Sequence, residues 1–225
     1  MGQQLEETKS PRVKICCINS VEESRFAIRC GASALGFVSE MPSGPGVISL
    51  DLIANIISSV PPAVSTFLLT SKQSINEIIK QHNHCRTNTI QIVDRLIEGT
   101  HKDLKKNLPG ISIVQVIHVT GEESIEEALS IEDSVDAILL DSGNRHATVK
   151  ELGGTGRAHN WNISNKIRAA LKIPIFLAGG LTPENITDAI KTVRPFGVDV
   201  CCGVRTNGHL DKQKCVKFFS RVYQS

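Results

Sequence analysis

Apolar residues in this chain gather in short runs, and amphipathic segments separate one run from the next. We expect strands at residues 13–18, 34–38, 64–69, 88–93, 112–118, 135–140, 173–178 and 196–202. Helical spacing or capping residues predict helices at 19–31, 49–59, 75–81, 100–107, from 120 onward, and at 161–171, 182–193 and 211–223. Strands that alternate with helices indicate an α/β protein. Eight such units predict a single (β/α)8 TIM barrel with a parallel eight-stranded sheet.

The last predicted strand-helix-strand unit carries the clearest candidate binding site. Gly179 and Gly180 follow one apolar run, Gly203 follows the next, and Thr182 can cap the helix between them. Glycines at these strand ends expose backbone amides, and the N-terminal pole of the helix adds positive potential. In parallel α/β barrels the loops after the last two strands commonly bind phosphate. We therefore expect a phosphate group here.

Composition narrows the classes of partner. The chain has 225 residues, of which 40% are apolar, 21% charged and 4% aromatic, and its net charge is +2. Scattered basic residues and few aromatics argue against nucleic acid as a partner. We expect a polar leader at 1–12 and one barrel domain at 13–225. The leader lacks the apolar segment of a secretion signal or membrane span, and seven cysteines, an odd number, fit a reduced cytoplasm.

Residues that follow the predicted strands are the candidates for chemistry, because the active face of such a barrel is at the carboxyl ends of its strands. Cys16 ends the first strand and Asp141 follows the sixth, so a thiol and a carboxyl face each other across the barrel mouth. Such a pair suits proton transfer to and from a small substrate. The other strand-end candidates are Cys17, Ser39, Thr70, Gln91, Asp94 and His118.

Each candidate also has a purely structural interpretation. Cys16 can be a small buried apolar residue, Asp141 can cap a turn, and His118 can be a hydrogen-bonded strand end. The long connection 142–160 contains Gly153-Gly154-Thr155-Gly156, which is either part of a site or only a flexible loop.

Two cysteine doublets raise the question of a metal site. Cys16-Cys17 and Cys201-Cys202 belong to the first and last predicted strands, which become neighbours when the barrel closes. Adjacent strand residues point to opposite faces, so we expect about one inward thiol from each pair, too few for a closed zinc site. We expect the cluster at 82–85 (HNHC) to be a solvated turn past a helix end.

Several motifs, in their order along the chain, resemble phosphoribosylanthranilate isomerase. The resemblance covers most of the chain and is most specific toward the C-terminus. The motifs are VKIC at 13–16, ALGFV at 34–38, LLD at 139–141, GGTG at 153–156 with Trp161 downstream, LAGGLTPEN at 177–185 and RPFGVDV at 194–200.

The resemblance implies a fold, a reaction and residue roles. It implies a (β/α)8 barrel that catalyses the Amadori rearrangement of N-(5-phosphoribosyl)anthranilate in tryptophan biosynthesis, without metal or organic cofactor. Cys16 would be the general base at the sugar C2, and Asp141 the general acid at the ring oxygen. The phosphate-binding residues would be Gly154, Gly179, Gly180, Cys202 and Gly203.

The chain departs from the family pattern mainly where the aromatic acid would bind and beside the catalytic cysteine. The departures are Cys17 for glycine, Gly44-Pro45-Gly46 for Ser-Pro-Arg, Gln91-Ile92-Val93-Asp94 for Gln-Leu-His-Gly, Cys201-Cys202 for a serine pair and Arg205 for an acid. The family's arginine binds the anthranilate carboxylate. Its loss would cost about 1.5 to 3 kcal/mol unless Arg145, Arg157 or Arg205 replaces it.

Two alternatives remain open at this point. One is a paralogous barrel isomerase acting on a different phosphorylated, sugar-like substrate, which the altered loop at 44–46 and the missing histidine favour. The other is a non-catalytic binder of phosphate ligands, which would need the glycines but neither Cys16 nor Asp141. In each case the partner is a phosphorylated small molecule, and we expect a cytoplasmic monomer or homodimer.

Overall fold

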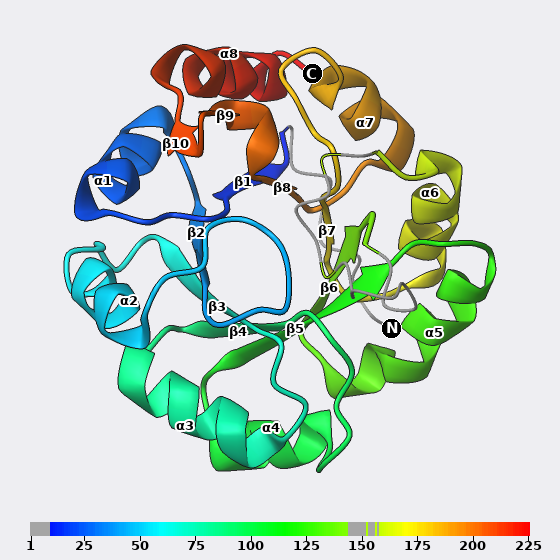
Figure 1. The fold of residues 1–225 in the computed structure, drawn as a ribbon. Coiled ribbons are helices and arrows are strands. Elements are labelled where there is room, and N and C mark those ends of the chain that lie inside the picture. Colours follow the sequence, from blue (N-terminus) through cyan, green and yellow to red (C-terminus); the bar gives the residue numbers. More distant parts are fainter. Residues whose placement is uncertain (1–9, 144–151, 153–155, 157) are drawn as a thin grey trace.

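The fold is a closed barrel of parallel strands inside a ring of helices (Figure 1). The computed structural model describes residues 10–143, 152, 156 and 158–225. Each strand pairs with the next, and the last pairs with the first, which confirms the predicted (β/α)8 barrel. The strands are β1 (Arg12–Ile15), β2 (Ala34–Val38), β3 (Ser65–Thr70), β4 (Thr89–Ile92), β5 (Ser112–His118), β6 (Ala137–Asp141), β7 (Ile175–Leu177) and β8 (Gly197–Val200).

One α-helix follows each strand. They are α1 (Val21–Cys30), α2 (Leu50–Ile57), α3 (Ile75–Cys85), α4 (His101–Asn107), α5 (Glu123–Ile131), α6 (Trp161–Ala170), α7 (Ile186–Val193) and α8 (Lys212–Tyr223). Polar side chains fix where several of them begin, because they accept hydrogen bonds from the first free amides. Ser20, Ser49 and Asp211 do so for α1, α2 and α8, and Thr100 forms a capping box with Asp103 at α4.

Alternation along the strands divides the buried side chains into two layers. Val13 and Ile15 of β1 belong to the core between barrel and helices, whereas Cys16, directly after β1, belongs to the core inside the barrel. Three phenylalanines of the inner layer make edge-to-face contacts, with centroids 5.8 Å apart for Phe67 and Phe176, and 5.6 Å for Phe176 and Phe196. These rings fill the barrel, so the substrate-sized space lies at its mouth.

Some predicted boundaries were wrong. β1 ends at Ile15 instead of residue 18, and Cys17 lies in the left-handed region with φ 62°. α7 begins at Ile186 because the Asn185 side chain accepts the Thr182 amide at 2.8 Å, which closes a separate turn before the helix. Thr182 therefore shapes that turn instead of capping α7.

The predicted solvated turn at 82–85 was also wrong. These residues form the last turn of α3, and His82 and Cys85 are buried. The Nε2 of the His82 ring donates a hydrogen bond to the Thr87 carbonyl oxygen, 2.8 Å away. Helical spacing continues past residue 81 because both side chains face the barrel.

Short elements that the sequence pattern did not predict lie before β6 and after β8. A 3-10 turn, η1 (Glu132–Ser134), precedes β6, and η2 (Cys202–Val204) follows β8. β9 (Arg205–Thr206) and β10 (His209–Leu210) then form a small antiparallel hairpin before α8. Within the described ranges, none of the helices has the length and apolar character needed to cross a membrane.

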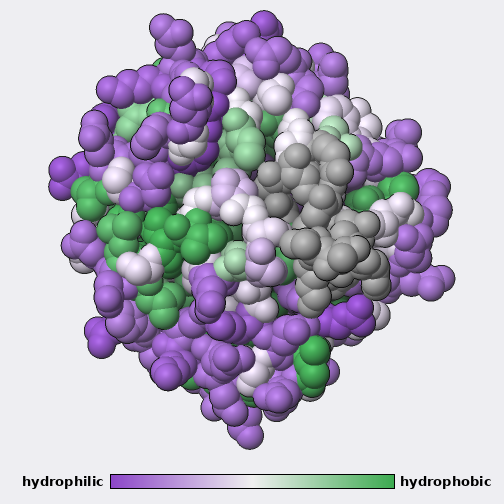
Figure 2. All heavy atoms as spheres, viewed as in Figure 1, coloured by the Kyte–Doolittle hydropathy of each residue, from purple (hydrophilic) through white to green (hydrophobic). Residues whose placement is uncertain are grey.

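The face at the carboxyl ends of the strands is the one shown in Figures 1 and 2. The loop between β2 and α2 crosses in front of the barrel there (Figure 1). Figure 2 shows hydrophilic residues around the rim of this face, and paler and hydrophobic residues toward its middle. The described residues toward the middle of this face are thus less polar than those at its rim, as is common for a ligand site.

Candidate active site

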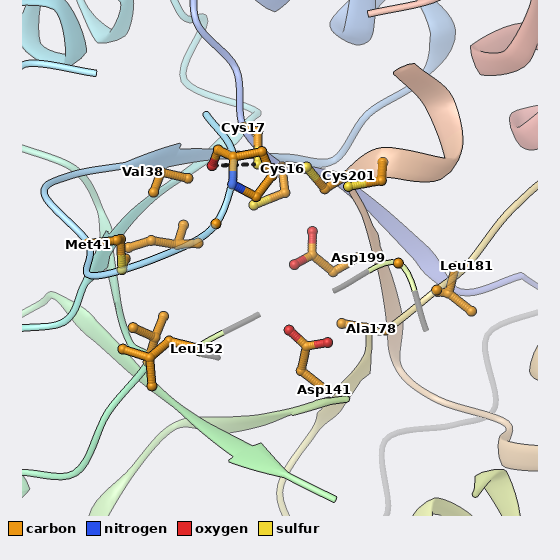
Figure 3. Close-up of a pocket in the computed structure, with 18 of the residues that line it drawn as sticks. Cys16, Cys17, Val38, Met41, Asp141, Leu152, Ala178, Leu181, Asp199 and Cys201 are labelled. Atoms are coloured by element: carbon orange, nitrogen blue, oxygen red, sulfur yellow. Dashed lines mark hydrogen bonds between the residues drawn. The ribbon is translucent and has the colours of Figure 1, made fainter. Parts of the chain in front are cut away.

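A pocket opens at the barrel mouth, and most of the predicted site residues line it. Cys16 and Asp141 line it together with Gly179, Gly180, Cys202 and Gly203. Gly154 lies outside the described residues. Figure 3 shows the Asp141 carboxyl group across the pocket from the sulfurs of Cys16, Cys17 and Cys201. The prediction that a thiol and a carboxyl face each other across the mouth is therefore confirmed as geometry.

Cys16 lies directly after β1 above a buried ion pair. Its amide donates to the Val200 carbonyl at 2.9 Å, so pairing with β8 fixes its backbone. Lys14, two residues earlier on the same face, is fully buried, and its Nζ lies 2.8 Å from Oδ2 of Asp199 and 5.2 Å from the centroid of the Phe67 ring. Gly36 makes room for both side chains: a Cβ there would lie 2.9 Å from the Lys14 Nζ and 3.0 Å from the Cys16 Sγ.

The charge on Lys14 is secured by its neighbours. Burial alone would lower the pKa of Lys14, but the Asp199 carboxylate, and next the Cys16 sulfur, raise it above its usual range. Lys14 therefore stays protonated. The Lys14 ammonium and the Cys16 sulfur are neighbours at this end of β1, since both lie close to the position that a Cβ at Gly36 would take.

Asp199 is the buried carboxyl group that the sequence reasoning missed. Burial raises its pKa to about 6, against the opposing effect of Lys14, and the nearby charge of Asp141 raises it further. Its Oδ2 binds Lys14, whereas its buried Oδ1 has no partner and the side chain lines the pocket. The sequence carried one sign of it, because Asp199 stands inside the apolar run at 196–202. A carboxyl group buried in such a strand needs a compensating partner.

Asp141 is held at the end of β6 by local hydrogen bonds. Its Oδ1 accepts the Ser142 amide at 2.7 Å, and its carbonyl oxygen accepts the Val119 amide at 2.9 Å. The turn-capping interpretation is thus correct for one carboxyl oxygen, but the side chain also lines the pocket.

His159 is a second residue near Asp141 that the sequence reasoning missed. A Cβ at Gly179 would lie 3.0 Å from the His159 Nδ1 and 3.1 Å from the Asp141 Oδ1, so both atoms flank that glycine. Burial lowers the pKa of His159 despite the opposing charge of Asp141, so the ring is neutral at pH 7. Its Nε2 shares a hydrogen bond with the Ser164 hydroxyl, 2.6 Å away, which orients the ring.

The glycines at the ends of β7 and β8 have conformational reasons to be glycine. Gly179 and Gly180 have φ of 81° and 61°, in the region that disfavours side chains. A Cβ at Gly203 would overlap the carbonyl oxygen of Leu181. The two loops therefore approach each other closely at the place where the sequence predicts phosphate.

The loop after β2 lies against Cys17. Ser43, Gly44 and Pro45 line the pocket, and the Cys17 thiol lies 3.6 Å from the Pro45 carbonyl oxygen. Gly46 has φ 79°, and a Cβ there would lie 2.5 Å from the Cβ of Cys17. This loop presents no cation to the pocket, as its sequence indicates.

Arg205 does not replace the missing arginine. It is 8% exposed, and its Nη1 and Nη2 each lie 3.0 Å from a carboxylate oxygen of Glu23. Nη2 also donates to the carbonyls of Cys16 at 3.2 Å and Cys17 at 2.6 Å. Arg205 thus fixes the backbone that carries the two cysteines. Arg145 and Arg157 lie outside the described residues.

The remaining strand-end candidates divide into two groups. Gln91 lines the pocket, as the chain order predicts. The side chains of Ser39, Thr70 and His118 instead hydrogen-bond neighbouring elements, at Leu69 O (2.7 Å), Gln81 Oε1 (2.6 Å) and Val93 O (3.0 Å). For His118 this is the structural role that the sequence left open. Among the described residues, no cluster of three or more His, Cys, Asp or Glu side chains is suited to hold a metal ion.

Comparison with known proteins places the chain in a family. The family model for N-(5'-phosphoribosyl)anthranilate (PRA) isomerase matches residues 13–221. The chain belongs to this family. The PRA isomerase of Methanothrix thermoacetophila is 34% identical over 211 residues, which cover 94% of this chain and 97% of that protein.

Solved PRA isomerase structures agree with this membership. That of Thermotoga maritima superposes with a TM-score of 0.79 at 28% identity, covering 96% of this chain and all of that one. A structure of the enzyme in complex with reduced 1-(o-carboxyphenylamino)-1-deoxyribulose 5-phosphate gives 0.77 at 27% identity, with 96% of this chain and 100% of that chain covered. The likeness to PRA isomerases thus extends over the whole barrel.

Proposed function

We propose that this chain is a phosphoribosylanthranilate isomerase of tryptophan biosynthesis. It would convert N-(5-phosphoribosyl)anthranilate to 1-(o-carboxyphenylamino)-1-deoxyribulose 5-phosphate. The observation that carries the proposal is a family match over residues 13–221 together with Cys16 and Asp141 facing one pocket. A cytoplasmic monomer or homodimer that needs no metal or organic cofactor completes the proposal.

In the proposed reaction Asp141 acts first, as general acid. It donates a proton to the ring oxygen while the bond from C1 to that oxygen breaks, and the anilino nitrogen lone pair forms a C1–N double bond. The Cys16 thiolate then removes the proton from C2. The resulting enol carries nitrogen at C1 and tautomerises to the amino ketone. Protonated Lys14, held by Asp199, lies beside the Cys16 sulfur during the transfer.

The phosphate would bind to backbone amides at the ends of β7 and β8. Gly179, Gly180, Cys202 and Gly203 line this side of the pocket. The loops after β7 and β8 lie so close together that a side chain at Gly203 would overlap the Leu181 carbonyl, so glycine there keeps the backbone amides accessible. Gly154 is proposed to contribute from the connection before α6. The positions of the base and acid then follow from the phosphate as an anchor.

One observation favours a second candidate. The loop at residues 43–46 brings no cation to the pocket, and Arg205 is occupied by Glu23. The alternative is the same Amadori chemistry on another amino-phosphosugar that lacks the anthranilate carboxylate.

Turnover measurements test both proposals. We expect the purified chain to consume freshly made phosphoribosylanthranilate, followed as loss of anthranilate fluorescence, and Cys16→Ala or Asp141→Asn to lower kcat by about 10²- to 10⁴-fold. Cys30→Ser is the matched control, because this thiol is outside the pocket. Unchanged turnover in Cys16→Ala would contradict the assigned base, and no turnover by the parent chain would contradict the function.

A substrate analogue separates the two candidates. Phosphoribosylaniline lacks the carboxylate but retains the reacting atoms. If a cation binds the carboxylate, kcat/KM should fall by about tenfold to a hundredfold with the analogue, as expected for a charge-assisted hydrogen bond. Equal kcat/KM for both compounds would favour the alternative substrate.

A further inference from the structure

Two of the departures from the family pattern meet in space. Cys17 follows β1 and Cys201 follows β8, 184 positions later, yet their Sγ atoms lie 2.6 Å apart and share a hydrogen bond. Both residues line the pocket next to Cys16 (Figure 3). All four cysteines of the two doublets line the pocket, so the expectation of one inward thiol per doublet was wrong. Strand alternation does not apply to them, because they lie past the ends of β1 and β8.

The backbone holds the two thiols in this position. β1 pairs with β8 up to Ile15 opposite Val200, so the residues that follow are brought together when the barrel closes. Cys17 keeps φ 62°, a conformation that disfavours a side chain, while Arg205 binds its carbonyl oxygen. A bonded sulfur pair is about 2.05 Å long, so bond formation needs a contraction of only about half an ångström.

The surroundings give the two sulfurs different roles. Hydrogen bonds with Cys17 and Cys202, together with the nearby charges of Arg205 and Lys14, lower the pKa of the Cys201 thiol. Hydrogen bonds with Cys16 and Cys201, together with burial, raise the pKa of Cys17. Cys201 is therefore the nucleophile, and Cys17 is the thiol that keeps its proton until Cys201 has reacted.

We propose that Cys17 and Cys201 form a reversible disulfide at the edge of the pocket, made by exchange with a small-molecule disulfide such as oxidised glutathione. The Cys201 thiolate attacks one glutathione sulfur, and the other glutathione leaves as a thiolate. Cys17 gives its proton to that thiolate, attacks the Cys201 Sγ and expels the second glutathione as a thiolate, which takes from water the proton that Cys201 had released on ionising. Two protein thiols are oxidised to one disulfide, and one glutathione disulfide is reduced to two thiols.

The link would join the two segments that the proposed reaction uses. Cys17 directly follows Cys16, and Cys201 directly precedes Cys202 and Gly203 at the proposed phosphate site. The segments after β1 and β8 are in contact through these two cysteines. Bringing the two sulfurs to bonding distance therefore moves Cys16, the proposed base, relative to the proposed phosphate site. Displacements of this size lower turnover strongly, because proton transfer depends on alignment.

Mass spectrometry tests the disulfide on the full chain. After treatment with oxidised glutathione, we expect the intact mass to fall by two hydrogens, the cross-link to map to Cys17 and Cys201, and excess reduced glutathione to restore the mass. The Cys16→Ala/Cys202→Ser variant removes ambiguity within the doublets and should behave in the same way. An unchanged mass, or a cross-link between other cysteines, would overturn the proposal.

Cys17→Gly is the matched control, because glycine tolerates φ 62° without strain. This variant should stop at the mixed disulfide and gain the mass of one glutathione at Cys201. Loss of two hydrogens in Cys17→Gly, or a lasting mixed disulfide in the parent chain, would also overturn it.

A turnover measurement tests the effect on the site, and it alone rests on the proposed function. Oxidised parent chain, with Cys16 shown to be free by peptide mass, should turn over phosphoribosylanthranilate about tenfold or more slowly than the reduced chain. Equal rates would overturn the functional effect. If neither form shows turnover, the proposed function fails while the mass experiment still decides the disulfide.

Discussion

Removing the charge of Lys14 should destabilise the barrel far more than removing the charge of an exposed lysine. Lys14 is fully buried and 2.8 Å from Oδ2 of Asp199. At that distance, with an effective dielectric constant of about 20, the attraction is about 6 kcal/mol before the cost of desolvating both charges. Lys14→Met leaves Asp199 buried without its counter-ion, so we expect a loss of about 3 to 5 kcal/mol in unfolding free energy.

A double-mutant cycle isolates the pair. Asp199→Asn leaves Lys14 as the unpaired charge and should cost about as much, so the two single losses sum to about 6 to 10 kcal/mol. The double variant buries no charge, and its main cost is the partly unsatisfied amide, about 1 to 3 kcal/mol. The double variant should therefore be more stable than either single variant or nearly equal to the better one.

Urea unfolding at pH 8 is the assay, because Asp199, with a pKa of about 6, is ionised there. Lys217→Met is the control: Lys217 pairs with Glu184 at 2.9 Å, but both side chains are more than half exposed, so its midpoint should not change. If the double variant loses as much stability as the two single variants together, Lys14 and Asp199 are not energetically coupled. Even if its stability is restored, Lys14→Met/Asp199→Asn should convert phosphoribosylanthranilate more slowly than the parent chain, because it lacks the cation beside Cys16.

The buried Asp199 carboxyl group should make the stability depend on pH. Burial raises the pKa of Asp199 to about 6, so the stability that its neutral form provides is present below about pH 4 and lost as pH rises through 6. The unfolding free energy of the parent relative to Asp199→Asn should fall by about 3 kcal/mol over that range, and a flat difference would contradict this. Gly46→Ala should lower Tm, because its Cβ would lie 2.5 Å from that of Cys17 and its φ is 79°. In a Cys17→Gly background the loss should shrink to the backbone strain of about 1 to 2 kcal/mol, and an equal loss in both backgrounds would refute the contact.

Much of the barrel follows from local pattern. The apolar runs predict all eight strands, and β2 and β5 begin and end at the predicted residues. Because parallel strands of a closed barrel end on one face, Cys16 and Asp141 could be placed at the same mouth without knowledge of any contact. The sequence thus predicts those parts of the site that depend on strand direction and strand ends alone.

The parts that depend on side-chain pairing could not be predicted. Cys17 looks like a strand residue, yet pairing with β8 stops at Ile15 and frees it to turn toward Cys201. Arg205 is a plausible carboxylate ligand until Glu23, 182 positions away, is seen to hold it. Thr182 is a residue type that often caps helices, but the Asn185 side chain accepts the Thr182 amide and closes a separate turn before α7. In each case a distant or competing partner overrides a sound local preference.

The contacts that complete the barrel mouth join the two ends of the chain, and this has a consequence for synthesis on the ribosome. Lys14 is separated from Asp199 by 185 positions, and Glu23 from Arg205 by 182. During translation the first strand emerges long before its partners exist, and domains generally fold as units once their sequence is available. In a nascent chain Lys14 therefore stays hydrated, and the first strand cannot be buried at low cost until β8 has left the exit tunnel and brings Asp199 beside it.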